Sequence, residues 1–128
     1  MRELKFRGLT ANGDMVYGYL VPDLPDSTVY YKEYSQRICW YEGQAHHNIP
    51  VKNGTVGQYT GLKDSYSIDE YFGDIIEEKD GVRLIIEDGL SSVWYKNIKT
   101  GGGKYFWQLD VHKVIGNIFE NPELWEKE

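Results

Sequence analysis

The sequence predicts a mostly β fold, a small barrel or roll, and two observations support this. Aromatic residues make up 15% of the 128 residues, with 11 Tyr and 4 Trp. Such side chains suit half-exposed strand faces, because the ring is buried while the polar tip stays in water. The stretch 56–76 (VGQYTGLKDSYSIDEYFGDII) has strand-forming residues at both ends. Its glycines, Gly57, Gly61 and Gly73, permit the bends that a barrel corner needs.

The residues before this stretch predict a hairpin and two further strands. Leu4–Leu9 alternates apolar with other side chains, which is the period of a half-buried strand. Met15–Val21 is expected to return beside it after the turn signal Asn12-Gly13. Pro22 and Pro25 then predict a loop. The remaining expectations are strands at Thr28–Tyr34 and Arg37–Tyr41, a loop at Glu42–Asn48 and an extended segment at Ile49–Val51.

After Gly73 the sequence predicts a three-stranded meander. Asp74–Lys79 and Val82–Glu87 flank Asp80-Gly81, which suits a two-residue type I′ turn. That turn places Glu78 opposite Arg83, Ile76 opposite Ile85 and Ile75 opposite Ile86. A second turn at Asp88-Gly89 leads into the third strand, Ser92–Tyr95.

The last third of the chain predicts two more strands and a short helix. The glycine-rich segment Asn97–Gly103 reads as a loop between strands, and Lys104–Leu109 and Lys113–Phe119 have strand composition. Asn121 is a suitable helix cap with Pro122 in the first position. Because few residues follow, we expect this helix to depend on docking through Leu124 and Trp125.

Length and composition favour one soluble domain, residues 1–128, in a reducing cytoplasm. A chain of 128 residues has the commonest size of a single domain. The lone Cys39 cannot form an internal disulfide, and its apolar neighbours suit ordinary burial. No stretch approaches the roughly 20 apolar residues that span a membrane, so no membrane partner is expected.

The net charge of −6 is unevenly distributed along the chain. Residues 1–63 contain 7 Lys and Arg against 6 Asp and Glu, whereas residues 64–128 contain 7 against 14. An acidic half argues against a nucleic-acid partner, whose phosphates require a basic surface. It permits binding to basic surfaces, although a solvated face that aids solubility is the simpler explanation.

Three groups of residues invite a chemical interpretation, and each has a structural one that we prefer. His46, His47 and His112 suggest a metal site, but adjacent histidines on an extended chain point to opposite faces. Thr100–Lys104 lacks the spacing and the following Ser or Thr of a phosphate-binding loop. The carboxylates Asp69, Glu70, Asp74, Glu77, Glu78 and Asp80 are explained as strand-edge charges that deter aggregation, with Asp74 capping turn amides. We therefore predict no catalytic, metal or cofactor-binding residues and no cofactor.

Adjacent aromatic pairs provide the one candidate binding surface. Because neighbouring residues on a strand face opposite ways, one member of each pair should point inward and the other outward. Outward rings suit a protein interface, where Tyr and Trp are enriched, or base stacking. The pairs are Tyr30-Tyr31, Trp40-Tyr41, Trp94-Tyr95 and Phe106-Trp107.

Four segments together resemble the YopX family of phage and prophage proteins. They are the basic start Arg2–Arg7, the motif VGQYTGLKD at Val56–Asp64, the step Gly73-Asp74 and the ending GNIFENPEL at Gly116–Leu124. The resemblance spans the chain and implies an SH3-like barrel or roll with extra elements and no assigned activity. One departure is Tyr66-Ser67, where the family often has Asn-Gly, so the turn type there is left open.

These observations favour a non-enzymatic phage accessory protein that acts in the host cytoplasm by binding a protein. Its expected partner is a host or phage protein, or a second copy of the chain. The alternative is a small nucleic-acid-binding β-barrel that uses Arg2, Lys5 and Arg7 of the first strand. An enzyme acting through the region of Asp74 is the third and least supported class.

Overall fold

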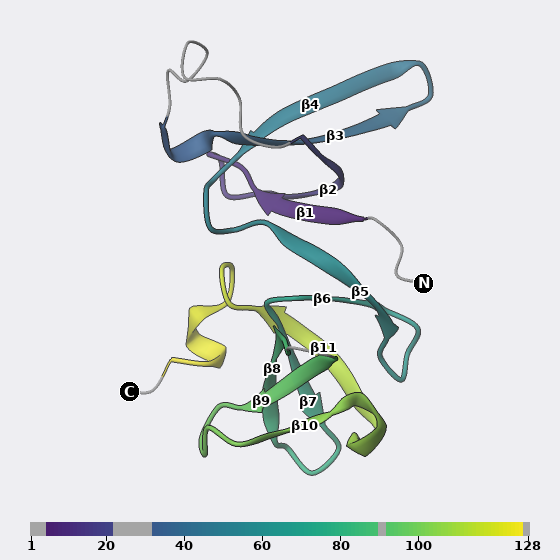
Figure 1. Ribbon diagram of the computed structural model, residues 1–128, viewed down its shortest axis with the longest axis vertical. Helices are drawn as coiled ribbons and strands as arrows, with labels where there is room; N and C mark the ends of the chain where they lie inside the picture. Colours follow the sequence, from purple (N-terminus) through teal and green to yellow (C-terminus); the bar gives the residue numbers. More distant parts are fainter. Residues whose placement is uncertain (1–4, 22–31, 90–91, 127–128) are drawn as a thin grey trace. The chain divides into compact units, whose positions relative to one another are not determined.

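The computed structural model describes residues 5–21, 32–89 and 92–126, and its regular elements are β-strands joined by turns and 3-10 helices (Figure 1). The predicted mostly β class is confirmed. The residues group into two compact units, the N-terminal unit of residues 3–58 and the C-terminal unit of residues 59–128. The expectation of a single domain stays a prediction. The described part contains no helix with the length and apolarity to cross a bilayer.

The N-terminal unit is an antiparallel sheet in the order β4-β3-β2-β1-β5. Here β1 and β2 form the predicted hairpin, with Phe6 opposite Gly18 and Leu9 opposite Met15. Ile38 and Val51 are fully buried in this unit. The strands are β1 (Phe6–Leu9), β2 (Met15–Val21), β3 (Gln36–Glu42), β4 (Ala45–Val51) and the beginning of β5 (Gly57–Lys63).

Two predictions in this unit are wrong. The loop predicted at Glu42–Asn48 ends early, because Ala45 pairs with Glu42 and begins β4. The polar side chains there reflect exposure on an outermost strand, where a proline such as Pro50 is also tolerated. Of the strand predicted at Thr28–Tyr34, the last three residues instead form the 3-10 helix η2 (Lys32–Tyr34), and the others lie outside the described residues.

The C-terminal unit begins within β5, which pairs with β6 (Asp69–Tyr71) through Tyr59 and Tyr71. A second antiparallel sheet follows in the order β10-β9-β8-β7-β11, and it contains the predicted meander. One face of this sheet carries the core, formed by Ile76, Leu84, Ile86, Val93 and Tyr95. Its strands are β7 (Asp74–Glu78), β8 (Arg83–Asp88), β9 (Val93–Asn97), β10 (Gly103–Tyr105) and β11 (His112–Asn117).

The β7–β8 hairpin is present, but its predicted register is wrong by one residue. Ile75 lies opposite Ile85, Ile76 opposite Leu84, and Glu77 opposite Arg83. The connection has three residues, because the Glu78 amide donates to the Val82 carbonyl at 2.9 Å and the Gly81 amide to the Glu78 carbonyl at 2.8 Å. Gly81 has a φ of +92°, as the third residue of such a loop requires.

The C-terminal segment forms one 3-10 turn, η4 (Pro122–Leu124), in place of the predicted helix. Asn121 does not cap it with its side chain. Its Oδ1 instead accepts the Asn117 amide at 3.1 Å, which ties the segment back to β11. The predicted docking is confirmed for Trp125, whose Nε1 donates to the Ile118 carbonyl at 3.1 Å.

Among the described residues neither sheet closes on itself, so a closed barrel is not observed. The strand predicted at Lys104–Leu109 is shorter than expected. Strand β10 ends at Tyr105, and the 3-10 helix η3 (Phe106–Gln108) follows. Strand β11 pairs with β7, and its other edge is met by the turn after β5, where the Ser65 amide donates to the His112 carbonyl at 3.1 Å and the Val114 amide donates to Asp64.

Candidate functional site

Four aromatic side chains form a continuous surface in the C-terminal unit, here called the aromatic cluster: Trp94, Tyr105, Phe106 and Trp107. The Tyr105 and Trp107 rings stack with centroids 4.7 Å apart and planes inclined by 13°. Trp94 meets Tyr105 edge-on at 4.9 Å, and Phe106 meets Trp107 edge-on at 5.1 Å. Stacked and edge-to-face contacts are both favourable arrangements for aromatic rings.

The positions of these rings follow from the local backbone. Trp94 and Tyr105 are opposite one another in the β9–β10 pairing. A Cβ atom at Gly103 would lie 2.7 Å from the Trp94 ring, so glycine is what lets that ring lie across β10. The Tyr105 amide then donates to Gln108 Oε1 at 2.8 Å as the chain turns into η3. That turn places Phe106 and Trp107 outside the sheet.

The outer rings of the aromatic cluster are open to solvent. Trp107 is 63% exposed and Phe106 is 44% exposed. Exposed apolar surface of this kind indicates an interaction site when it is contiguous. Trp and Tyr are also the residues that most often dominate the energy of protein interfaces. The aromatic cluster is therefore the strongest candidate contact surface in the C-terminal unit.

The alternation predicted for adjacent aromatic pairs is confirmed only where the backbone is a strand. Tyr95 is 1% exposed and faces the core, while its neighbour Trp94 lies in the aromatic cluster. On β3, Tyr41 is 72% exposed and Trp40 is half-buried. For Phe106-Trp107 the prediction is wrong, because a 3-10 turn lacks the two-residue period of a strand. Tyr30-Tyr31 lies outside the described residues.

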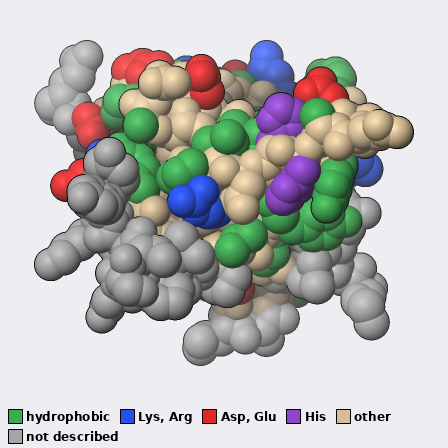
Figure 2. Space-filling model, turned by 90° about the horizontal axis from the view of Figure 1, so that it is seen from above, with side chains coloured by type: hydrophobic (Ala, Val, Ile, Leu, Met, Phe, Trp, Pro, Cys, Tyr) green, Lys and Arg blue, Asp and Glu red, His purple; other side chains and the backbone are tan. Residues whose placement is uncertain are grey.

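A second exposed group, the tyrosine face, consists of Tyr17 and Tyr19 on β2 and Tyr41 on β3 in the N-terminal unit. All three are exposed, Tyr17 at 46%, Tyr19 at 66% and Tyr41 at 72%. The Tyr41 ring also stacks on His46 of β4 with centroids 4.7 Å apart. In the view of Figure 2, the histidine side chains lie next to hydrophobic ones at the surface. This surface mixes rings with groups that can carry positive charge, including Arg37 on β3.

A buried polar group, the histidine network, joins three strands of the C-terminal unit. It consists of Glu70 on β6, Tyr95 on β9 and His112 on β11. His112 Nε2 lies 2.7 Å from Glu70 Oε2, and the Tyr95 hydroxyl donates to the other carboxylate oxygen. His112 Nδ1 lies 2.9 Å from the Asp110 carbonyl oxygen. The Glu70 side chain is fully buried, and that of His112 is 11% exposed.

The partners of His112 define its protonation. The Asp110 carbonyl oxygen can only accept, so Nδ1 carries a proton and donates to it. The hydrogen bond to Glu70 accordingly raises the pKa of His112 against the opposing effect of burial. Burial and the neighbouring Glu70 also raise the pKa of Tyr95, which keeps its proton for donation. With both nitrogens engaged inside the protein, this arrangement favours a structural role over proton transfer to a substrate.

Asp64, which ends the motif VGQYTGLKD, organises the turn between β5 and β6. Its Oδ1 accepts the amides of Tyr66 and Ile68 at 2.8 and 2.9 Å, and its Oδ2 accepts the Val114 amide at 2.9 Å. Burial acts to raise the pKa of Asp64, but these backbone hydrogen bonds outweigh it and the pKa is lowered. Ser67 itself adopts a φ of 66°, the left-handed angle that a glycine would take.

His46 and His47 point to opposite faces as predicted, but they lie on a strand and not in the predicted loop. On β4 they lie opposite Tyr41 and Trp40. His112 belongs to the histidine network of the C-terminal unit. Across the described parts of the chain, no group of three or more His, Cys, Asp and Glu side chains is arranged to hold a metal ion.

The strand-edge explanation of the carboxylates is wrong for most of them. Strand β7 lies inside its sheet, between β8 and β11. Glu70, Asp74 and Glu78 are 0%, 2% and 3% exposed, so they are internal hydrogen-bonding groups. The predicted turn-capping role of Asp74 is confirmed, because its Oδ2 accepts the Tyr71 amide at 2.8 Å.

The glycine-rich segment forms the predicted hairpin loop, between β9 and β10. Its Lys104 has a structural partner: Nζ lies 2.8 Å from the buried Glu78 Oε1. The Asp110 amide donates to the other Glu78 oxygen at 2.8 Å. The lysine that suggested a phosphate loop thus holds β10 against β7.

Sequence reasoning missed the histidine network and the place of Tyr105 in the aromatic cluster. Glu70, Tyr95 and His112 are far apart in the chain, and only the strand pairing brings them together. A partial signal was available. Side chains alternate along a strand, so His112 and Val114 of β11 share a face. Val114 packs against the core, and the inward-facing Tyr95 belongs to the same core.

Comparisons with known proteins identify a family and a fold. The family model described as YopX protein matches residues 5–126. The crystal structure of protein EF1440 from Enterococcus faecalis is similar with a TM-score of 0.54 and 21% sequence identity. That similarity covers 95% of this chain and 97% of the other and concerns the fold alone. No curated protein matches the chain.

Proposed function

Because this chain belongs to the YopX protein family, whose model covers nearly all of it, we propose that it is a non-enzymatic accessory protein of phage or prophage origin that binds another protein. The aromatic cluster is the proposed contact surface. The partner is a protein of the host or the phage, or a second copy of this chain, and the interaction takes place in the bacterial cytoplasm.

The exposure of stacked rings is the observation that carries this proposal. Tyr105 and Trp107 are held in one geometry by stacking, while 63% of Trp107 stays in contact with water. A pre-organised ring loses little conformational entropy when a partner covers it. Burying such a side chain at the centre of an interface typically contributes 2 kcal/mol or more.

The hydrogen bonds of the histidine network support a non-enzymatic role for the protein. Both nitrogens of His112 and both oxygens of Glu70 have partners inside the protein. General acid–base catalysis requires a group that can reach a substrate proton. The network instead supplies hydrogen bonds between strands.

A partner-capture experiment tests the proposal with a matched control. Tagged wild-type protein, Trp107→Ala and Tyr66→Ala are each used to recover proteins from host cells. Tyr66 is 65% exposed and lies in the same unit outside the aromatic cluster. We expect Trp107→Ala to lose, by about tenfold or more, a protein that wild type and Tyr66→Ala both retain. Equal recovery by all three variants contradicts the proposal, provided circular dichroism shows them folded.

Nucleic-acid binding is the second candidate, and the tyrosine face is the observation that favours it. Exposed Tyr17, Tyr19 and Tyr41 could stack on bases beside Arg37. Arg7, by contrast, is 3% exposed and is not a surface cation. Titration of labelled single-stranded and double-stranded DNA at low salt separates the two candidates. Binding that weakens steeply with added salt and is lost in Tyr19→Ala supports this one.

A further inference from the structure

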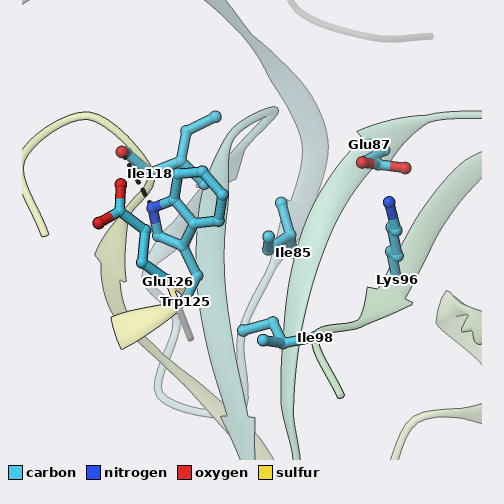
Figure 3. A pocket seen from close by; sticks show the side chains of 7 residues that line it. All are labelled: Ile85, Glu87, Lys96, Ile98, Ile118, Trp125 and Glu126. Carbon is cyan, nitrogen blue, oxygen red and sulfur yellow. Dashed lines mark hydrogen bonds between the residues drawn. The ribbon is translucent and has the colours of Figure 1, made fainter. Parts of the chain in front are cut away.

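A groove runs along the C-terminal unit on the sheet face opposite the core. It begins as a cavity of about 570 Å³ with mainly aliphatic and aromatic walls: Ile85, Ile98, Ile118 and Trp125. Figure 3 shows the Trp125 ring and the side chains of Ile85 and Ile98 around this hollow. The volume falls within the range of about 300–1,000 Å³ that is usual for ligand sites.

The C-terminal segment is held so that it forms a wall of the groove and does not fill it. Trp125 Nε1 donates to the Ile118 carbonyl at 3.1 Å, which fixes the plane of the indole ring (Figure 3). The amides of Trp125 and Glu126 both donate to the Pro122 carbonyl, at 3.2 and 2.9 Å. Ile85, Ile98 and Ile118 are consequently only half-buried.

A second hollow of about 850 Å³ continues the first, and the two share Ile98, Trp125 and Glu126. Acidic side chains outnumber basic ones along their combined length, five to three. One basic group, Arg83, is already paired with Glu77, with Nε and Oε2 3.1 Å apart. The charged side chains are Glu77, Asp80, Glu87, Glu123, Glu126, Arg83, Lys96 and Lys99.

We propose that this groove binds a basic peptide segment of a partner protein. An apolar side chain of the peptide enters the cavity against Ile85 and Trp125. Neighbouring Lys or Arg side chains lie along the second hollow beside Glu123 and Glu126. The indole face of Trp125 is also a favourable surface for a cation. The inference rests on the proposed function only in taking the partner to be a protein, and it uses a different surface from the aromatic cluster.

The charge and the shape of the groove both favour a basic peptide as its ligand. The excess of carboxylates disfavours nucleic acid and acidic peptides, because like charges repel at short range. Two connected hollows suit an extended chain, which can place side chains at intervals along them. An apolar wall beside acidic groups favours a peptide that carries both kinds of side chain.

The test is a titration with synthetic peptides at about 0.15 M salt. The probe is a labelled nonapeptide in which leucine alternates with lysine or arginine. The comparison peptides replace the basic residues with glutamate, or the leucines with serine. Fluorescence anisotropy should show binding of the basic leucine peptide and weak or absent binding of both others. Nuclear magnetic resonance should show the Trp125 indole N–H signal shifting on addition of the basic peptide.

Matched variants distinguish specific binding of the peptide in the groove from a general attraction of a basic peptide to an acidic protein. The double variant Glu123→Gln/Glu126→Gln should bind the peptide about three- to tenfold more weakly. The control Asp14→Asn/Glu42→Gln changes charge equally at exposed positions of the N-terminal unit and should bind like wild type. Equal weakening by both double variants, or binding of the glutamate peptide as tight as that of the basic one, overturns the inference.

The same titrations distinguish this inference from the proposed function. Trp107→Ala should bind the peptide like wild type, because Trp107 does not line the groove. Peptide binding that depends on Trp107 and not on Glu123 and Glu126 assigns the peptide to the aromatic cluster. That result, or no binding of the basic peptide at all, overturns the groove while leaving the protein-binding proposal standing.

Discussion

At the scale of single residues, the His112 side chain joins β11 to Glu70 of β6 and to the backbone of Asp110. His112 and Glu70 both lie largely out of water, since the Glu70 side chain is fully buried and that of His112 is 11% exposed. Removing one member of such a pair leaves the other buried without compensation. We therefore expect His112 to raise the free energy of unfolding of the C-terminal unit.

Stability should depend on pH through His112. Its pKa in the folded protein lies above the ordinary value of 6.5, so the folded state holds the proton more tightly. The stabilisation is fully present below pH 6.5 and is lost as pH rises through the folded-state pKa. Chemical denaturation of wild type and His112→Gln across this range measures it. The variant should be about 1–3 kcal/mol less stable at low pH, and the two curves should converge as pH rises.

Parallel stability curves for wild type and His112→Gln would contradict this account of the histidine network. The titration of His112 itself can be followed by nuclear magnetic resonance as a second check. A midpoint at or below the value of an exposed histidine would show that Glu70 does not hold the proton.

Ser67 offers a gain of stability from a single substitution. Its φ of 66° is costly for a residue with a Cβ atom, and glycine adopts it without that cost. We expect Ser67→Gly to stabilise the protein by about 0.5–1 kcal/mol after the extra flexibility of the unfolded chain is deducted. A thermal melt of Ser67→Gly beside Ser65→Gly measures this. A lower melting temperature for Ser67→Gly is the outcome that the backbone geometry excludes.

At the scale of elements, the β7–β8 hairpin determines which carboxylate is buried. The Asp80-Gly81 pair does lie in the connecting turn, but such a pair is compatible with loops of two or three residues. The three-residue loop pairs Glu77 with Arg83 on one face and leaves Glu78 on the buried face. Because side chains alternate along a strand, a shift of one residue exchanges the faces, and local sequence alone cannot resolve it.

The Glu78–Lys104 ion pair should contribute to holding β10 against β7. Lys104 Nζ lies 2.8 Å from Glu78 Oε1, and the Lys104 side chain is 32% exposed while that of Glu78 is 2% exposed. Lys104→Met should destabilise the protein by about 1–2 kcal/mol, because it leaves a buried carboxylate without its cation. The double variant Glu78→Gln/Lys104→Met should recover part of that loss. Denaturation of the four proteins as a double-mutant cycle measures the coupling, and a coupling of zero refutes it.

Elements were predictable where burial imposes a two-residue period and where a turn has a strong signal. The β1–β2 hairpin and the β7–β9 meander are such cases. Prediction failed at β4, whose polar residues reflect an exposed edge, and at η3, where aromatic composition suggested a continuing strand. The candidate contact surface was partly predictable, since Trp94, Phe106 and Trp107 were found as members of adjacent pairs. Tyr105, which connects them, directly precedes the predicted pair Phe106-Trp107 but was not predicted as part of the surface.

At the scale of the whole molecule, residues of the family motifs take part in contacts between segments that are far apart in the sequence. Asp64 of the central motif binds the Val114 amide of β11, and Gly116 of the C-terminal motif pairs with Ile75. In the same pairing Asp74 of the Gly73-Asp74 step lies opposite Asn117 of the C-terminal motif, so these two motifs are in contact. Both motifs are visible in the sequence, but the hydrogen bond from the Val114 amide to Asp64 spans 50 residues and is not readable from local periodicity.

The two units carry different surfaces, and each suits a different partner. The N-terminal unit presents the tyrosine face, whereas the C-terminal unit presents the aromatic cluster and the acidic groove. Most of the negative charge lies in residues 64–128. A protein partner of the C-terminal unit would therefore combine an apolar contact with a basic segment.

The affinity of Trp107→Ala for the captured partner tests the central claim most directly. Isothermal titration with the purified partner, or sedimentation if the partner is a second copy, compares wild type, Trp107→Ala and Tyr66→Ala. The account predicts a dissociation constant at least about tenfold higher for Trp107→Ala and unchanged for Tyr66→Ala. A folded Trp107→Ala protein that binds its partner as tightly as wild type would contradict the account.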